Sequence, residues 1–70
     1  MKEYLVIYES AEDNWAAYAP DVPGCIATGK TRAEVERTFR EAIAFHFEGL
    51  RQEGLPIPEP SAEVGRVAVA

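Results

Sequence analysis

The chain of 70 residues is 47% hydrophobic and 27% charged, a composition typical of one soluble globular domain. Its single cysteine excludes an internal disulfide, and one cysteine with one histidine is too few for the four ligands of a structural zinc site. The net charge of −5 disfavours nucleic-acid binding, because an acidic surface repels phosphates, and favours a basic protein partner.

The first half of the sequence predicts three short strands separated by turns. Their residues are β-branched, aromatic or small, and the strands are expected at residues 4–8, 15–19 and 25–28. The polar residues 10–14 suit a hairpin turn. Residues 20–24 contain two prolines and a glycine, which interrupt the strand pattern and indicate a second turn.

A capping box opens the one predicted helix. Thr31 is placed to cap the helix N-terminus, and Glu34 to reach back to it. Apolar positions then recur at helical spacing, at Val35, Phe39, Ala42, Ile43, His46 and Leu50. Gly54 is typical of the residue just beyond a helix end, and Pro56 cannot continue a helix. The helix is therefore expected at about residues 32–53.

The sequence closes with an extended linker and a last strand. Residues 55–60 include three prolines and cannot be helical. Residues 64–69 alternate enough to predict a strand. The predicted fold class is α+β: a single antiparallel β-β-β-α-β domain over residues 1–70, with one long helix packed on a small sheet.

The predicted sheet carries apolar side chains on both faces, although one helix covers only one of them. Tyr4, Val6 and Tyr8 share a face of the first strand, and Trp15 and Tyr18 lie on opposite faces of the second. We expect the uncovered face to carry several of the aromatic side chains and to be an interaction surface. The alternative is that the final strand and the proline linker fold over it.

The size of the chain favours self-association. A domain of roughly 60 residues buries only about 60% of its unfolded surface, and this chain has no disulfide or zinc site to stabilise it. We therefore expect a homo-oligomer, a dimer or higher. No apolar stretch fits a signal peptide or a membrane span, so we expect a cytoplasmic protein without membrane contact.

Neither candidate nucleophile or base has an evident catalytic neighbour in the sequence. His46 falls on the apolar face of the predicted helix and is interpreted as a core or interface histidine with one nitrogen hydrogen-bonded. Cys25 is interpreted as a small buried hydrophobe, since a reactive thiolate requires a nearby cation or helix N-terminus.

The acidic residues do not predict a metal site, because such a site needs several carboxylates that converge at the ends of adjacent strands. Glu9, Glu12 and Asp13 cluster around one turn, where they are expected to be solvated. Asp21 follows a proline and is expected to cap its own turn. We predict no catalytic residue, no metal ligand and no cofactor.

Residues 24–31 read Gly-Cys-Ile-Ala-Thr-Gly-Lys-Thr and match the Walker A pattern letter for letter. In a P-loop the intervening residues form a loop after a buried parallel strand, whereas here they are predicted to be a strand. We therefore interpret the match as a coincidence. The alternative function is a small nucleotide-binding or metal-dependent nuclease-like protein.

The order of these motifs resembles the HicB-like antitoxin family. The resemblance rests on Tyr18-x-Pro20-Asp21-Val22-Pro23-Gly24-Cys25, on x-x-x-Gly29-x-Thr31, on Glu34 and Glu41-Ala42-Ile43, and on Pro56-Ile57-Pro58 before the last predicted strand. It covers nearly all of the chain. It also explains Gly24 and Gly29 as turn glycines of the family rather than as a phosphate-binding motif.

The resemblance implies a fold and a partner. The family fold is β-β-β-α-β and is similar to a truncated ribonuclease H core without its catalytic acids. Family members typically bind a small HicA toxin, a ribonuclease with a double-stranded-RNA-binding-type fold, and mask its catalytic histidine. Many also carry a C-terminal DNA-binding module. The sequence ends directly after the last predicted strand, so we expect a stand-alone domain that binds no nucleic acid on its own.

We therefore predict a protein-binding module, not an enzyme, that sequesters and inhibits a HicA-like ribonuclease toxin. The candidate partner-binding residues are the aromatic anchors Tyr8, Trp15 and Tyr18 and the acidic rim Glu9, Glu12, Asp13 and Asp21. In one alternative the aromatic residues are used within the homo-oligomer. In another the chain is an orphan oligomeric domain without a toxin.

Overall fold

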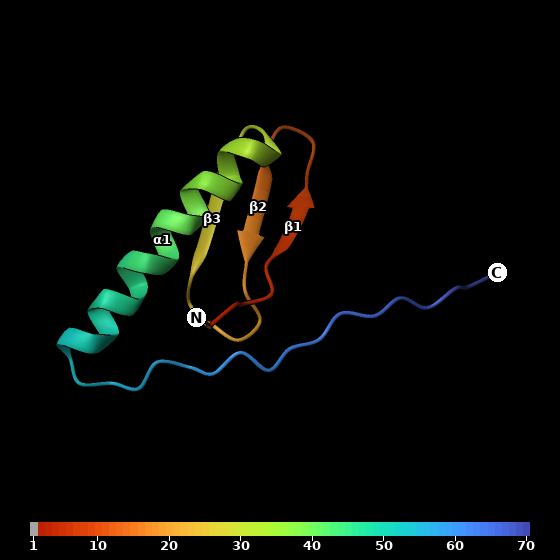
Figure 1. Ribbon diagram of the computed structural model, residues 1–70. Coiled ribbons are helices and arrows are strands. Elements are labelled where there is room, and N and C mark those ends of the chain that lie inside the picture. The colour runs from red at the N-terminus through yellow and green to blue at the C-terminus, as the bar shows by residue number, and fades with distance from the viewer. Residues whose placement is uncertain (1) are drawn as a thin grey trace.

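The computed structural model describes residues 2–70, in which three short strands form one antiparallel sheet (Figure 1). The strands are β1 (Ile7–Ser10), β2 (Trp15–Tyr18) and β3 (Ile26–Gly29), in the spatial order β1-β2-β3. The three predicted strands are confirmed, but β1 begins later than expected. Ile7 pairs with Tyr18, so the preceding residues would have to pair with Ala19 and Pro20, and a proline cannot donate to a ladder.

The helix α1 (Arg32–Gln52) begins and ends where the sequence predicts. The Thr31 hydroxyl accepts a hydrogen bond from the backbone N–H of Glu34, at 3.0 Å. The Glu34 carboxylate accepts one from the N–H of Lys30, also at 3.0 Å, rather than from Thr31 as in the standard capping box. At the other end Gly54 adopts a positive φ of 72°, and the N–H of Leu55 donates to the carbonyl of residue 50 at 2.8 Å.

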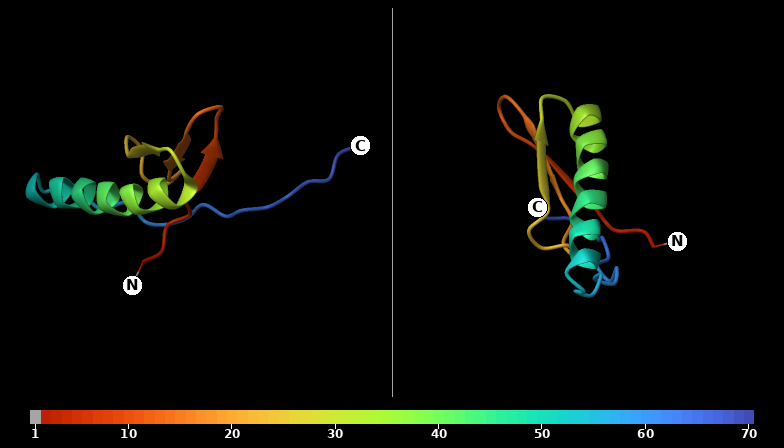
Figure 2. Two further views of the ribbon diagram at one scale, coloured as in Figure 1. Left: turned by 90° about the horizontal axis from the view of Figure 1, so that it is seen from above. Right: turned by 90° about the vertical axis from the view of Figure 1, so that its left-hand side faces the viewer.

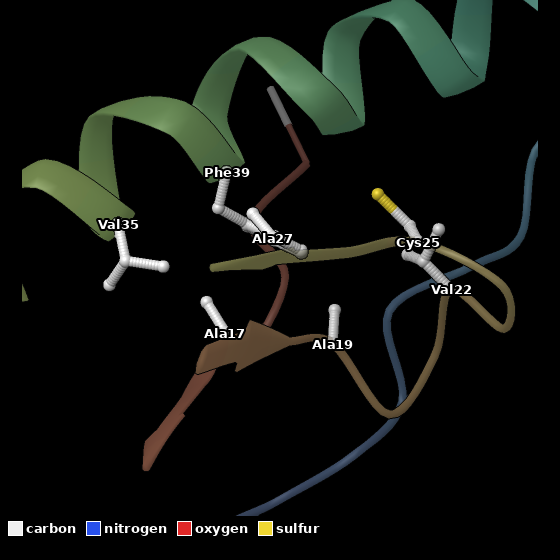
Figure 3. Packing of buried hydrophobic residues seen from close by; sticks show 7 residues of the cluster. All are labelled: Ala17, Ala19, Val22, Cys25, Ala27, Val35 and Phe39. Carbon is white, nitrogen blue, oxygen red and sulfur yellow. The ribbon is translucent and has the colours of Figure 1, made fainter. Parts of the chain in front are cut away.

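The helix lies across one face of the sheet and leaves the other face open (Figure 2). It packs mainly over β3 and β2. The core between these layers consists of small side chains from the strands and the β2–β3 loop, filled in from the helix by Val35 and Phe39 (Figure 3). Its buried members are Ala17, Ala19, Val22, Cys25, Ala27, Val35 and Phe39. The α+β class with one long helix on a small sheet is confirmed.

After the helix, residues 55–62 run back beneath one end of the sheet without forming a helix or a strand (Figure 1). Three side chains hold this linker in place. The Tyr4 hydroxyl donates to the carbonyl of Pro58 at 2.5 Å, Lys2 pairs with Glu59, and Asp21 binds the backbone at residues 61–62. The extended proline linker is thus confirmed, and it is attached to the N-terminal segment and to the β2–β3 loop.

The predicted last strand does not form in this chain, which corrects the expectation for residues 64–69. A strand requires a neighbouring strand to receive its hydrogen bonds, and this segment continues away from the body of the molecule (Figure 1). Val64, Val67 and Val69 are accordingly among the most exposed apolar side chains of the described residues. The alternation of the sequence is real, but the segment has no partner within its own chain.

Candidate protein-binding surface

The face of the sheet opposite α1 carries a row of apolar side chains. Because strand residues alternate between faces, Ile7 of β1, Tyr18 of β2 and Ile26 of β3 point to the same side, and the register places them directly beside one another. Ile26 is 64% exposed, while Ile7 and Tyr18 are half-buried. We call this side of the sheet, with its six residues Ile7, Glu9, Ala16, Tyr18, Ile26 and Thr28, the open face.

Most of the predicted aromatic residues lie on the other side of the sheet. Tyr4, Tyr8 and Trp15 are partly buried against the core beneath the helix, which corrects the expectation that they lie on the uncovered face. The Arg32 guanidinium stacks over the Tyr8 ring at 4.1 Å, a favourable cation–π geometry. The Tyr4 ring lies 5.2 Å from that of Phe47. Of the four aromatic side chains considered, Tyr18 is the one on the open face.

Three of the predicted acidic residues lie at or near one end of the open face. Glu9 belongs to it directly, since it pairs with Ala16 in the row next to Ile7. Glu12 and Asp13 are exposed in the β1–β2 turn, which is closed by a 2.8 Å hydrogen bond between residues 11 and 14. Within residues 2–70 none of the three forms a salt bridge. Their charges are therefore available to a partner at this end of the sheet.

Asp21 has a different position and a different role. It follows β2 at the opposite end of the sheet, and its carboxylate accepts hydrogen bonds from the N–H and hydroxyl of Ser61 and from the N–H of Ala62, at 2.8, 3.0 and 2.9 Å. The backbone donors at Ala62 and Ser61 lower the pKa of Asp21. The expectation that Asp21 caps its own turn is therefore wrong: it ties the β2–β3 loop to the linker.

A shallow hollow extends the open face beyond Tyr18 and Ile26. It has a volume of ≈ 470 Å³ and is lined beyond Tyr18 and Ile26 by the turn residues Pro20, Pro23 and Gly24. The turn is tight because Gly24 adopts a positive φ of 85°, which glycine tolerates best. Ile26 was not singled out from the sequence, although its two-residue spacing from Thr28 places both side chains on the same face of the strand.

The two residues considered for catalysis, Cys25 and His46, are packed among other side chains. Cys25 is buried, as predicted, and burial raises the pKa of its thiol, which disfavours the reactive thiolate. His46 is half-buried on the helix beside Phe47, with ring centroids 6.3 Å apart. Among residues 2–70 its ring makes no hydrogen bond, so the expected bonded nitrogen is not found. The same residues contain no group of three or more His, Cys, Asp or Glu side chains that could hold a metal ion.

The Walker A match does not have the geometry of a P-loop. Its central residues form the edge strand β3 of an antiparallel sheet, and the backbone N–H of Lys30 donates to Glu34. Gly29 is required for a close approach to the helix: a Cβ atom there would lie 3.0 Å from the Glu34 carboxylate and 3.1 Å from the backbone nitrogen of Val35. The motif therefore joins a strand to a helix and leaves no loop to surround a phosphate.

Comparison with known proteins agrees with this arrangement. Residues 4–68 match the family model described as the HicB-like antitoxin of bacterial toxin–antitoxin systems. The chain belongs to the HicB-like antitoxin family. Among solved structures it is similar to a chain of the HicA3 and HicB3 toxin–antitoxin complex, with a TM-score of 0.73 and 33% identity over 86% of this chain and 70% of that one. No helix within residues 2–70 is both long and apolar enough to cross a membrane.

The curated relatives differ in length. A UPF0150 protein of Thermoplasma acidophilum is 32% identical over 90% of this chain and 91% of its own. An uncharacterised 14.9 kDa protein of Haemophilus phage HP1 is 36% identical over 80% of this chain, and the antitoxin HicB 2 of Photorhabdus laumondii is 32% identical over 86%. The match spans only 42% and 43% of those two relatives, so this chain covers less than half of the length of each.

Proposed function

We propose that this HicB-like domain binds a HicA-like ribonuclease toxin and inhibits it by covering its active face. The observation that carries the proposal is the open face, an uncovered sheet surface with an apolar row and an acidic end. Membership of the antitoxin family and the similarity to a toxin–antitoxin complex support a partner of this class. We place the inhibition in the cytoplasm, where a free thiol such as that of Cys25 stays reduced.

Charge favours such an encounter. A toxin that grips RNA requires a basic active face, and this chain carries a net charge of −5. The carboxylates of Glu9, Glu12 and Asp13 lie beside the open face and form no salt bridge with any of residues 2–70. Complementary charge at the rim of an interface accelerates association and makes the rate sensitive to salt. In this proposal the three acidic residues steer the toxin and contribute less to the lifetime of the complex.

Apolar side chains supply the affinity. Tyr18 is flanked by Ile7 and Ile26, and the shallow hollow beyond them can receive a side chain of the partner. Tyrosine is among the residues that most often dominate the binding energy of interfaces. Tyr8 and Trp15 act indirectly in this proposal, since they shape the sheet from its covered side.

The test is a pair of matched charge reversals against the toxin of the same host. Glu12→Lys with Asp13→Lys should slow toxin association at low salt and reduce its salt dependence. Glu41→Lys with Glu53→Lys changes the net charge equally, but on the helix and at its C-cap, and should leave association near the parent rate. Equal effects of the two double variants would show that net charge alone acts, and would refute the acidic end as the steering site.

A second matched pair tests the apolar row. Ile26 and Phe45 are both large, apolar and exposed, but Ile26 lies on the open face and Phe45 on the helix. Ile26→Ala should accelerate toxin dissociation at least tenfold, which corresponds to about 1.4 kcal/mol. Phe45→Ala should leave it unchanged. If the parent domain binds no toxin of its host, the antitoxin assignment fails and the chain is an orphan domain.

We also propose that the domain self-associates. Among residues 2–70 the largest fully enclosed side chains are those of Val22 and Val35, and several apolar side chains outside the core are exposed. A domain of this size gains stability from a second subunit. Light scattering at micromolar concentration should give at least twice the 7.7 kDa mass of the chain. A mass of one chain at that concentration would refute self-association without affecting the toxin proposal.

A further inference from the structure

Two strand-like segments lack a neighbouring strand: the outer edge of β1 with the residues before it, and the C-terminal tail. The sheet order leaves one edge of β1 free, and residues 4–6 before β1 are half-buried and strand-like in sequence but unpaired. The C-terminal tail, residues 63–70, is also rich in β-branched side chains, and Val67 and Val69 are each 88% exposed. Unpaired edges and exposed strand-like segments tend to pair with another chain.

The helix-facing side of β1 borders an apolar groove. Because α1 packs mainly over β3 and β2, a groove of ≈ 210 Å³ lies between β1 and the helix. Tyr4, Val6 and Tyr8 line it from the strand side, and the helix contributes the apolar Phe39 and Ile43 together with the charged Glu36 and Arg40. The groove therefore follows the free edge of β1 and the unpaired residues before it.

The tail is directed away from the groove of its own chain. Asp21 fixes Ser61 and Ala62 beneath the sheet through three hydrogen bonds. From this point the tail passes the end of the sheet on the β1 side and continues outward (Figures 1 and 2). The match to the family model extends to residue 68, so most of the tail lies within the matched region.

We propose that the tail of one copy adds a strand to the free edge of β1 in a second copy, and that the second copy returns its tail in the same way. This inference rests on the self-association proposed above and names the segment that produces it. Each copy carries both the free edge and the tail, so a symmetric pair satisfies both at once. The added strand would also provide hydrogen-bond partners for residues 4–6, which do not extend the ladder with β2 because Pro20 has no N–H to donate.

Strand alternation determines which tail residues enter the groove. Val67 and Val69 share one face of an extended tail, and Arg66 and Ala68 share the other. With the valines turned toward α1, their side chains cover the groove beside Tyr4, Val6 and Tyr8 of the second copy. The opposite orientation would place the charged Arg66, in place of the two valines, over the apolar part of the groove that Tyr4, Val6 and Phe39 form, which is unfavourable for a charged group.

A matched pair of serine variants tests this orientation. Val67→Ser with Val69→Ser removes apolar groups from the groove side of the tail. Ala68→Ser with Ala70→Ser adds the same hydroxyls on the other side. By sedimentation equilibrium the valine variant should show a dimer dissociation constant raised by roughly tenfold or more, and the alanine variant one close to that of the parent. Equal constants for both variants would overturn the proposed docking of the valines.

Cysteine cross-linking distinguishes exchange between copies from pairing within one chain. In a Cys25→Ala background, one protein carries Val67→Cys and a second carries Tyr4→Cys, Val6→Cys or Tyr8→Cys. For at least one of the three positions, mixing the two proteins under mild oxidation should give a disulfide-linked dimer that neither forms alone. A chain that carries both cysteines and cross-links only as a monomer would overturn the proposal in favour of a tail that folds back on its own β1.

The outcomes also separate this inference from those on which it depends. A parent chain that is monomeric at micromolar concentration refutes self-association and the strand exchange together. A parent dimer that is equally stable after the valine substitutions and gives no mixed disulfide refutes the strand exchange alone. Toxin inhibition, measured separately on the same variants, is expected to persist wherever the open face is intact, because the tail joins the edge of β1 and does not cover the open face in this arrangement.

Discussion

Replacement of Phe39 by alanine tests the core that supports both faces of the sheet. Phe39 is only 2% exposed, and with Val35 it provides the large side chains that α1 sends into a core made mostly of alanines. Phenylalanine-to-alanine changes in cores cost about 3–5 kcal/mol, because apolar contacts are lost and the cavity collapses only in part. A domain of this size has a total free energy of unfolding of roughly 4–10 kcal/mol.

We therefore expect Phe39→Ala to remove between a third and all of the stability. Urea titration followed by circular dichroism at 222 nm gives the free energy of unfolding, and a thermal scan should show a Tm lower by at least about 12 °C. The control is Phe45→Ala, the same substitution in the same helix at a side chain that is 83% exposed. This variant should remain within about 0.5 kcal/mol of the parent.

The difference between the two variants isolates burial, because helix propensity changes equally in both. Each titration should be repeated at several protein concentrations, since a dimer is more stable at higher concentration. Similar losses for Phe39→Ala and Phe45→Ala would contradict the packing described here. A large loss for Phe45→Ala alone would mean that this exposed ring, and not Phe39, is covered in solution.

Three further predictions concern the motif residues. Asp21→Asn should accelerate amide hydrogen exchange at Ser61 and Ala62, and unchanged exchange would contradict the contact. Because the pKa of Asp21 is lowered in the folded protein, its stabilising contribution is complete above the ordinary pKa of 3.8 and is lost as the pH falls through the lower folded value. NMR of the parent at acid pH should therefore show the same release of residues 61–62. Gly29→Ala should destabilise the fold by about 1–3 kcal/mol in a denaturant titration, because the added Cβ would crowd Glu34 and the backbone of Val35. The control Gly49→Ala, whose Cβ would meet nothing within 4 Å, should be neutral or stabilising, and a larger loss of stability for Gly49→Ala than for Gly29→Ala would be inconsistent with these contacts. The Cys25 thiol should react with a maleimide far more slowly than a cysteine introduced by Thr28→Cys, because burial raises its pKa and restricts access, and comparable rates by mass spectrometry would show that the loop opens readily.

The elements whose signals are local followed from the order of residues alone. The capping residues Thr31 and Glu34 and the terminal Gly54 lie within a few residues of the backbone groups they satisfy, so the limits of α1 followed from their order. The prolines of residues 55–60 excluded a helix for the same reason. The motif around Gly24 and Gly29 was sufficient to indicate the family.

The tertiary structure decided which of the two sheet faces the helix covers. Alternation shows that Tyr8 and Ile7 point in opposite directions, but it is symmetric between the two faces. The helix covers the side of Tyr8 and Trp15, so the open face belongs to Ile7, Tyr18 and Ile26. The expectation of one uncovered sheet face is therefore confirmed, with Tyr18 but not Tyr8 or Trp15 on it, whereas the binding of a partner by this face stays a prediction.

The remaining differences involve pairing between distant segments. Asp21 finds its partner 40 residues further along the chain, and no short-range pattern distinguishes this from the capping of its own turn. Residues 64–69 have the alternation of a strand, but a strand forms only beside another strand with a free edge. Local interactions within a few residues can be read from the order of amino acids, whereas contacts across the fold depend on how the chain closes in space.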